Sequence, residues 1–448
     1  MKPSTVQATA RQLLEKPGRG LCRKPVDSKI FWMPDQSTPG YGSGVHGWRN
    51  FYETINFCIE EKNMHTLLSQ EDLAFKALCE AYVNRELAPL ARKLGEIDDV
   101  PEALRASLSH SGVYAPLFPK EYGGQGISAV RICLAREAIA GVYAPADTTL
   151  AMQGLGGYPI VLAGNAAQKQ KYLPALAEGE RLTTFCLTEP EAGSDVAAMQ
   201  TTARADGDDF VINGRKRFIS NGYSADMGIL FARTPTDANP KAISAFIVEK
   251  EMPGWNVHRR IELMASHDIV EFEIKDLRVP KQNLLGTVGG GFKLAMQTLD
   301  LMRMSVGAAA LGMAQTALQH SLQFARGRVQ FGRPIVEFQS TAFKLADMAV
   351  DIEAARSLVY LAAIKKDKGD PSASLHSSIA KLYATEAAFR CIDQAVQIHG
   401  GVGVVKGSTV ERLYREIRPL RVYEGTTEIQ KLVISSHLIK QAGREAGK

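Results

Sequence analysis

A single acidic residue near the C-terminus has the surroundings of a candidate catalytic base. Glu424 lies in RVYEGTTEIQKL, residues 421–432, where Gly425 follows it directly and a helix-like tract comes next. A carboxylate can act as a general base, and a neighbouring glycine leaves room for a ligand beside it. For a glutamate taken alone, a solvated loop residue is the commoner interpretation. Which of the two interpretations holds, catalytic base or loop residue, depends on the other candidate residues in the sequence.

Two candidate clusters lie in the middle of the sequence. In FCLTEPEAGSDVAAMQ, residues 185–200, the hydroxyls of Thr188 and Ser194 surround Gly193. Backbone N–H groups and hydroxyls in such a loop suit a polar ring or a phosphate, although a Pro/Gly turn with an aspartate N-cap explains the same residues. In RKRFISNG, residues 215–222, Phe218 and Ser220 could stack on and hydrogen-bond a flat heterocycle, or they could simply end a strand.

Two further clusters follow nearer the C-terminus. RGRVQFGRPIVEFQ, residues 326–339, has Arg328 at a helix terminus before the corner formed by Phe331 and Gly332. This arginine could bind a pyrophosphate bidentately, or it could complement the helix dipole. QIHGGVG, residues 397–403, has paired glycines after a helix. Such glycines allow close approach of a ligand, and they are also common helix C-caps.

Several other chemistries are disfavoured. No G-x-G-x-x-G follows a strand in a βαβ setting, and neither G-x-S-x-G nor H-E-x-x-H occurs. The pair His267-Asp268 is best interpreted as surface strand chemistry. The six cysteines form no C-x-x-C pair, so we expect no zinc or other metal site. The thiols are predicted to be small buried hydrophobes in a reducing compartment.

Length and charge bound the class of protein. The chain has 448 residues, which is too many for one ordinary domain. Its net charge of +5 is small and scattered, so nucleic acid is not expected as a partner. No stretch approaches 18 consecutive apolar residues, which predicts no membrane span.

The elements that must position the candidate groups follow the order α, β, α. Helical periodicity begins near residue 67, with Ser69 as a predicted N-cap. One helix face is predicted to consist of Phe75, Leu78, Cys79 and Tyr82. Short β-rich runs begin near residue 183, and Asn213-Gly214 predicts a type I′ hairpin there. Long helical tracts with short connections return after residue 289, which predicts an antiparallel bundle.

The predicted fold class is therefore α+β multidomain. Residues 1–66 form an N-terminal extension of unknown role, and residues 67–182 form an N-terminal α-helical domain. Residues 183–288 form a middle β-barrel or sandwich domain. Residues 289–448 form a C-terminal four-helix bundle.

In this order and setting, the clusters resemble the acyl-CoA dehydrogenase family from about Leu68 to Ile439. The matching stretches are TEPEAGSD, INGRKRFISNG, LRVPKQNLLG, GGGFKLAMQTLD, RVQFGRPIVEFQ, QIHGGVG and YEGTTEIQ. Each stretch is weak by itself. Their joint occurrence in sequence order is highly specific.

The resemblance implies a FAD enzyme that inserts a trans double bond between Cα and Cβ of an acyl-CoA thioester, with a short, medium or branched acyl chain favoured. In the family, a glutamate removes the α-proton and flavin N5 takes the β-hydride. Electron-transferring flavoprotein is the usual acceptor. The family is usually a homotetramer, a dimer of dimers, with each FAD across a subunit boundary. The implied location is the cytoplasm in a bacterium or the mitochondrial matrix in a eukaryote.

The resemblance also assigns roles to residues. Glu424 falls at the base, whose N–H polarises the thioester oxygen together with the flavin ribityl 2′-hydroxyl, and Gly425 leaves room for the acyl chain. The CoA thioester contacts fall on Ser194, Asp300 and Arg303. The contacts with the flavin end of FAD fall on Leu187, Thr188, Ser194, Phe218, Ile219 and Ser220. The contacts with its pyrophosphate and adenosine fall on Arg328, Phe331 and Gln339 and, from a neighbouring subunit, on Gln397, Gly400 and Gly401. Thr426 and Glu428 are also expected to touch FAD.

The sequence departs from the family pattern at several of these positions. Phe218 replaces a frequent tryptophan, Ser220 a frequent threonine, and Glu428 a glutamine of several members. A minority branch carries its base at the position of Met302, which cannot take a proton, and this favours Glu424. Residues 266–269 read Ser-His-Asp-Ile where most members have a Ser-Asp-Thr-like triplet, which leaves the substrate class open.

Other functions remain open within and outside this family. An oxidase, a decarboxylating dehydrogenase for a diacid and a dehydrogenase acting on a carrier-protein thioester would share the fold. A decarboxylating enzyme needs a cation at the far end of the acyl pocket, which the sequence does not locate. A non-catalytic flavin-binding or nucleic-acid-binding relative would lack the base and carry a strongly basic extra domain, and the presence of Glu424 and the modest charge argue against it.

Overall fold

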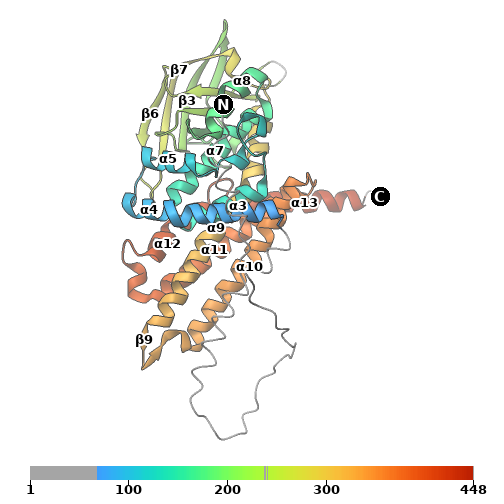
Figure 1. Ribbon diagram of the computed structural model, residues 1–448. Helices are drawn as coiled ribbons and strands as arrows, with labels where there is room; N and C mark the ends of the chain where they lie inside the picture. The colour runs from blue at the N-terminus through green and yellow to red at the C-terminus, as the bar shows by residue number, and fades with distance from the viewer. Residues whose placement is uncertain (1–67, 237–238, 240, 447–448) are drawn as a thin grey trace. The chain divides into compact units, whose positions relative to one another are not determined.

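The computed structural model of the chain describes residues 68–236, 239 and 241–446. The extension predicted for residues 1–66 lies outside these described residues. Within them, helices come first, a β-sheet follows and helices return (Figure 1). The predicted fold class, with a helical domain, a central β domain and a C-terminal helical bundle, is therefore confirmed.

The first helical domain begins at the predicted N-cap. Ser69 forms a reciprocal capping box with the residue three positions on, which satisfies free N–H groups of the first turn. Phe75, Cys79 and Tyr82 are buried as predicted, but Leu78 is 37% exposed, so the buried stripe is narrower than the periodicity suggests. The elements of this domain are α3 (Gln70–Tyr82), the π-helical turn η1 (Val83–Leu87), α4 (Ala88–Leu94), α5 (Glu102–His110), α6 (Ala129–Ala140), α7 (Ala144–Ala163) and α8 (Ala166–Ala177).

One curved sheet forms the central domain. Its main path runs β6-β7-β3-β2-β4-β5-β8, and β1 pairs in parallel with β4. Most of the other neighbours are antiparallel. The strands are β1 (Thr183–Cys186), β2 (Thr202–Asp206), β3 (Asp209–Ser220), β4 (Met227–Arg233), β5 (Ile243–Glu249), β6 (Trp255–Arg260), β7 (Ile269–Pro280) and β8 (Leu284–Leu285).

The hairpin predicted at Asn213-Gly214 is wrong. Both residues lie inside β3, where a register shift against β7 marks a bulge. The Asn213 side chain exchanges two hydrogen bonds with Asp276 of β7, and a Cβ on Gly214 would overlap Thr201. The turn that joins β2 to β3 passes instead through Gly207, whose φ is 59°. The Asn-Gly pair thus serves a bulge and a close strand approach.

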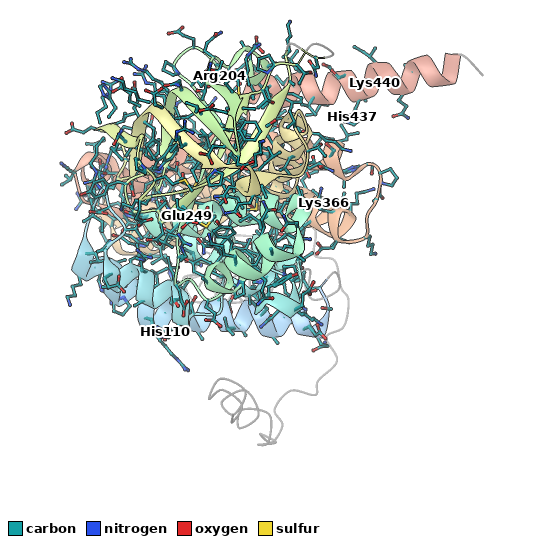
Figure 2. The ribbon with its side chains drawn as sticks, turned by 90° about the horizontal axis from the view of Figure 1, so that it is seen from above. His110, Arg204, Glu249, Lys366, His437 and Lys440 are labelled. Carbon is teal, nitrogen blue, oxygen red and sulfur yellow. The ribbon has the colours of Figure 1, made fainter. Side chains whose placement is uncertain are left out.

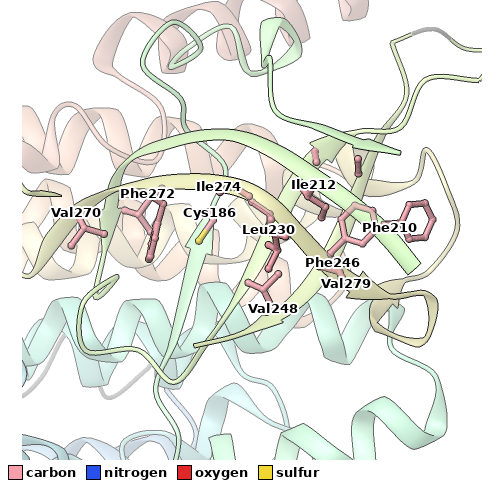
Figure 3. Packing of buried hydrophobic residues seen from close by; sticks show 14 residues of the cluster. Cys186, Phe210, Ile212, Leu230, Phe246, Val248, Val270, Phe272, Ile274 and Val279 are labelled. Carbon is pink, nitrogen blue, oxygen red and sulfur yellow. The ribbon is translucent and has the colours of Figure 1, made fainter. Parts of the chain in front are cut away.

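The core of the central domain shows how strongly the sheet curves. Buried side chains of β1, β2, β3, β4, β5 and β7 meet in one apolar cluster (Figure 3). Phe210 of β3 and Phe246 of β5 lie edge to face, with ring centroids 5.0 Å apart, although two strands separate them in the sheet. The sheet therefore wraps around its own core, as sheets with a strong twist can.

A buried ion pair fixes the loop between β1 and β2 onto β3. Lys216 Nζ donates to the Leu187 carbonyl at 3.1 Å and to Glu189 Oε1 at 2.7 Å, and both charged side chains are almost fully buried. The backbone N–H groups of Gln200 and Thr201 also donate to the Glu189 carboxylate. Burial alone would raise the pKa of Glu189, but these partners outweigh it and lower the pKa. Glu189 therefore has a structural role in the loop.

Long helices form the C-terminal bundle. Helices α9, α10 and α11 pack pairwise, and α12 packs on α9 and α11. Helix α13 extends beyond the bundle and carries His437 and Lys440 (Figure 2). None of the helices within the described ranges has the length and hydropathy that crossing a bilayer requires. The elements are α9 (Gly291–Gly327), the hairpin β9 (Val329–Gln330) and β10 (Arg333–Pro334), α10 (Gln339–Asp367), α11 (Ala373–His399), α12 (Thr409–Leu420) and α13 (Thr427–Ala446).

Helix α7 connects the three parts of the protein. It is buried over most of its length, and it packs on both β1 and α9. A Cβ at Gly156 would overlap Thr183 of β1, and a Cβ at Gly154 would lie 2.7 Å from Met302 Cε of α9. Glycine at these two positions lets the strand and the bundle approach the same helix. The cysteines among the described residues, Cys79, Cys133, Cys186 and Cys391, are buried free thiols, as predicted.

Lys216→Met is expected to lower the free energy of unfolding by about 3–5 kcal/mol, because it leaves Glu189 as an unpaired buried charge. Urea-induced unfolding followed by circular dichroism measures this loss. Arg215→Met is the matched control on the same strand. Its exposed pair with Glu273 should contribute less than about 1 kcal/mol. Equal losses in the two variants would show that the buried pair does not hold the loop.

Candidate active site

Glu424 lies on a strained turn between α12 and α13. Its φ is 52°, and Gly425 follows with a φ of 92°. Left-handed backbone is rare for a residue with a side chain, and it persists where the surroundings hold it in place. Here Gln430 Nε2 donates to the carbonyls of Glu424 at 3.2 Å and Gly425 at 3.0 Å, and Lys381 Nζ donates to Gly425 at 2.8 Å. Glycine suits position 425 because a side chain would be strained at this φ, and a Cβ would also displace Gln430 Nε2, from which it would lie 2.5 Å away.

The Glu424 carboxylate is partly buried among charged groups. Its Oε2 atom is shielded from solvent and has no hydrogen-bond partner in the part of the chain that the structure describes. Burial raises the pKa of Glu424, and Asp147 adds to the rise. Three cations, Arg136, Lys381 and Arg303, oppose this rise without cancelling it. A raised pKa suits a general base, and here it arises in surroundings that contain several charged side chains.

A buried ion pair lies next to this carboxylate. Arg136 Nε and Nη2 donate to the two Asp147 oxygens at 2.8 and 2.7 Å, and Nη1 donates to Ser305 Oγ at 3.0 Å. The Tyr423 side chain also lies against Arg136. Sequence reasoning missed this pair. An arginine inside the apolar tract of α6 was the available signal, because a buried arginine needs a partner.

Met302 occupies the alternative position for a base. Its side chain is fully buried, and its Sδ and Cε atoms face Gly154 of α7. It lies one residue before Arg303 in α9. A thioether cannot take a proton at neutral pH, so Met302 cannot serve as a base. Glu424 therefore remains the candidate.

The two predicted CoA contacts lie one helical turn apart on α9. Arg303 Nη1 contacts Asp300 and Ser378 Oγ only at 3.5 Å, and its buried Nε has no partner among the described residues. Lys366 Nζ donates to Asp300 at 3.0 Å. Arg303 therefore retains donor capacity next to Glu424, whereas Asp300 is already paired.

The residues assigned to the flavin ring come together where β1 and β3 end. Leu187 and Ile219 are buried, Thr188 and Ser220 are half-buried, and the Phe218 ring is 49% exposed. The Arg217 N–H donates to the Thr188 carbonyl at 2.9 Å, which joins the two segments. Phe218 has a φ of 58°. Strained backbone beside an exposed ring and a hydroxyl fits a cofactor contact.

His267 lies on this group. Its Nε2 atom is 2.8 Å from Ser220 Oγ, and its backbone N–H donates to Asp98 at 2.8 Å. Burial lowers the pKa of His267 to about 4, so the ring is neutral at physiological pH. Asp268 is buried and accepts the Ser224 N–H at 3.0 Å. The interpretation of His267-Asp268 as surface strand chemistry is wrong, since both residues precede β7 and build the loop around Ser220.

The residues assigned to the pyrophosphate and adenosine lie where α9 ends and α10 begins and where α11 ends. Phe324 and His399 stack with ring centroids 4.4 Å apart, which joins the ends of α9 and α11. The hairpin that follows α9 lies at the end of the bundle away from the sheet (Figure 1). The exposed residues gathered here are Arg328, Phe331, Gln339, Gln397, Gly400 and Gly401. A single chain thus does not bring them to the flavin-ring group.

The chemistry of this second group fits a dinucleotide. The Phe331 ring is 94% exposed, and the Arg328 guanidinium pairs with no other described side chain. A Cβ at Gly400 or Gly401 would meet nothing within 4 Å, so open space surrounds this turn. An unpaired guanidinium, an exposed ring and an open glycine turn suit a pyrophosphate and its adenosine. The residues present therefore fit FAD.

The remaining predicted contacts have clear positions. Thr426 Oγ1 accepts the Ile429 N–H at 3.3 Å and so caps α13, while Glu428 is exposed in its first turn. Ser194 is exposed on the β1–β2 loop beside Gly193, around which space is open. A surface hollow of about 490 Å³ lies elsewhere on this loop. It is lined by Glu189, Pro190, Glu191, Gln200, Gly214, Arg215, Glu273, Ile274 and Lys275, none of which belongs to the Glu424 site.

The chain matches the acyl-CoA dehydrogenase family over nearly all of the described region. The N-terminal domain of the family matches residues 69–180, the middle domain residues 184–277 and the C-terminal domain residues 289–439. A Bacillus subtilis acyl-CoA dehydrogenase is 41% identical over 376 residues, or 83% of this chain and 99% of that protein. The mouse mitochondrial short-chain specific acyl-CoA dehydrogenase is 37% identical over 402 residues, which are 89% of this chain and 95% of that protein.

Solved structures agree. Butyryl-CoA dehydrogenase from Megasphaera elsdenii has a TM-score of 0.79 at 39% identity and covers 83% of this chain and 99% of that one. A structure described as an electron transferring flavoprotein of Acidaminococcus fermentans has a TM-score of 0.79 at 39% identity. The match covers 83% of this chain and 98% of that one. An acyl-CoA dehydrogenase complexed with FAD from Bacillus anthracis has a TM-score of 0.78 at 32% identity, covering 85% and 68%.

The chain belongs to the acyl-CoA dehydrogenase family. It is thus an oxidoreductase of a flavoprotein family that uses FAD, as the sequence predicts.

Glu424→Gln is expected to stabilise the ligand-free protein at neutral pH by about 0.5–2 kcal/mol, the range common for stabilising substitutions. A raised pKa means that ionised Glu424 destabilises the folded state, and the amide removes that charge. The gain should shrink as the pH falls through the pKa of Glu424, because folded and unfolded states are then both protonated. Urea unfolding at several pH values measures it.

Glu428→Gln is the control for this effect. Glu428 is exposed at the start of α13, and its pKa is lowered by its own backbone N–H and by Thr426. This variant should therefore gain no stability at neutral pH. A gain at Glu428, or a pH-independent gain at Glu424, would contradict the assignment of a raised pKa to Glu424.

Proposed function

We propose that this protein catalyses α,β-dehydrogenation of an acyl-CoA thioester, with Glu424 as the base that removes the α-proton. The observation that carries the proposal is the Glu424 carboxylate itself. One of its oxygens is buried without a partner among the described residues, on a strained turn that three hydrogen bonds from Lys381 and Gln430 hold in place. Strain and an unsatisfied carboxylate oxygen are costs that a purely structural turn would not keep.

The same turn supplies a second requirement of the reaction. Removing the α-proton of a thioester puts negative charge on its carbonyl oxygen, which must be stabilised by a hydrogen-bond donor. The N–H of Glu424 donates to no group of residues 68–236, 239 or 241–446. It is therefore available to the thioester oxygen. When bound, FAD supplies the acceptor for the hydride that leaves Cβ.

A short or branched acyl chain suits the surroundings of the base. Tyr423 and the Arg136–Asp147 pair occupy the space near the carboxylate with large side chains. The similarity to proteins named short-chain specific and butyryl-CoA dehydrogenases supports the same class. Medium chains remain within the proposal.

A decarboxylating reaction on a diacid is less well supported. It would need a free cation at the far end of the acyl chain. Arg136 is a cation near the base, but three of its nitrogens already donate to Asp147 and Ser305. Its charge is neutralised by a bidentate partner, so it is poorly suited to bind a second carboxylate.

The positions of the flavin residues support an assembly of more than one copy. One chain holds the flavin-ring group and the pyrophosphate group apart, so each FAD would draw on two subunits. Arg328, Phe331 and Gln339 share one end of the bundle with Gln397, Gly400 and Gly401. Both sets would then serve the flavin of the neighbouring subunit, whereas the resemblance gives that role to the second set alone. Exposed apolar residues on α10 and α13, namely Phe343, Val350, Leu438 and Ile439, suit burial in a homotetramer that is a dimer of dimers.

The electron acceptor is proposed from similarity. The structure described as an electron transferring flavoprotein of Acidaminococcus fermentans contains a chain that matches this one over most of its length. An electron-transferring flavoprotein is therefore the first acceptor to test. With bacterial and mitochondrial relatives, the proposed location is the cytoplasm or the mitochondrial matrix.

The proposal is tested by mixing the purified, FAD-loaded protein anaerobically with butyryl-, octanoyl-, palmitoyl-, isobutyryl-, isovaleryl- and glutaryl-CoA. Flavin absorbance should bleach with one of the short or branched thioesters. Glu424→Gln should keep FAD but slow the bleaching by at least about 100-fold, the lower range for loss of a general base. Glu428→Gln is the matched acidic control and should slow it little. Absence of bleaching with every thioester would refute the proposed reaction.

A further inference from the structure

Lys381 is a buried lysine without a carboxylate partner. Its side chain is fully buried near the middle of α11, and its Nζ atom donates to the Gly425 carbonyl at 2.8 Å. It forms no ion pair with any residue that the structure describes. An ammonium group that is buried without a counter-ion is costly, and such groups persist mainly at functional sites.

The charges around Lys381 tie it to Glu424. Glu424 is the strongest attractive partner, Arg303 repels it, and Glu386 and Glu428 contribute less. Burial lowers the pKa of Lys381 to about 8, so the group still carries its charge at neutral pH. Glu386 is already paired with Arg421, which leaves Glu424 as the carboxylate that Lys381 serves.

We propose that Lys381 is a positioning residue for the base, which holds the strained turn through the Gly425 carbonyl and keeps Glu424 deprotonated by its charge. This inference rests on the proposed function of Glu424. Two separate effects are combined in one side chain. The hydrogen bond fixes where the carboxylate lies, and the charge sets the pH at which it can accept a proton.

The chain provides a matched neutral residue that separates these effects. Gln430 Nε2 donates to the same Gly425 carbonyl at 3.0 Å and is also fully buried, but it carries no charge. Gln430→Leu should loosen the turn without changing the electrostatic surroundings of the carboxylate. Lys381→Met loses both the hydrogen bond and the charge. The other charged groups that face Glu424, namely Arg136, Asp147 and Arg303, are retained in both variants.

The experiment measures kcat/KM for butyryl-CoA against pH in the FAD-loaded wild type, Lys381→Met and Gln430→Leu. The acidic limb of the profile should move to higher pH by about one unit or more in Lys381→Met, because a nearby opposite charge no longer lowers the pKa of Glu424. Gln430→Leu should reduce the rate at all pH values and leave the limb where it is. Lys381→Gln, which retains a donor without charge, should shift the limb as Lys381→Met does.

The outcomes separate this inference from the proposed function. A wild type that reduces its flavin with none of the thioesters would refute the function itself. If the wild type is active and the acidic limb of the pH profile does not move in either Lys381 variant, the proposed role of Lys381 is overturned. An equal shift of that limb in Gln430→Leu would overturn it as well. Urea unfolding of each variant supplies the folding control. Lys381→Met loses the hydrogen bond to Gly425 and an opposite charge beside Glu424, so it should unfold more easily than wild type but remain folded under the assay conditions.

Discussion

The balance of charge around one partly buried carboxylate organises the rest of this structure. Burial raises the pKa of Glu424, and three cations hold the rise in check. These cations come from three helices, α6, α9 and α11, so the two helical domains must meet at this point. Helix α7 makes that meeting possible, because its glycines let β1 and α9 approach the same helix. The positions of the domains and the ionisation of the base are thus linked.

Buried charges also explain the parts of the protein that lie away from the base. The Lys216–Glu189 pair holds the β1–β2 loop, whose following residues include the exposed Ser194. The Arg136–Asp147 pair fills the wall beside Tyr423. Such pairs add little net stability compared with apolar packing of the same volume. Their value is that each has one satisfactory arrangement, so they fix the geometry of a loop and a pocket wall.

The sequence predicted the order of elements well, since helical periodicity and β-rich runs are local signals. It also singled out Glu424 as the candidate base, because a distinctive set of motifs surrounds it, and that role stays a prediction. It failed where one sequence signal can indicate two structures. Asn213-Gly214 is typical of a hairpin turn, but here the glycine lets two strands approach too closely for a side chain. It could not find Lys381, Arg136 or the contact of His267 with Ser220, because those roles depend on residues brought together from distant segments. The contacts of FAD and CoA remain predictions from resemblance.

The position of the proposed base, Glu424, on a turn and not on a helix would have a chemical consequence. At the position of Met302, inside α9, a residue's N–H would be used by the helix itself, and a base there could offer only its carboxylate. On the turn, the left-handed conformation of Glu424 leaves its own N–H without an acceptor in the described chain. In the proposed reaction, one residue would then both accept the α-proton and donate to the thioester oxygen on which the charge develops. The strain of the turn is the cost of placing both groups at one point, and Lys381 and Gln430 hold the carbonyls that keep it there.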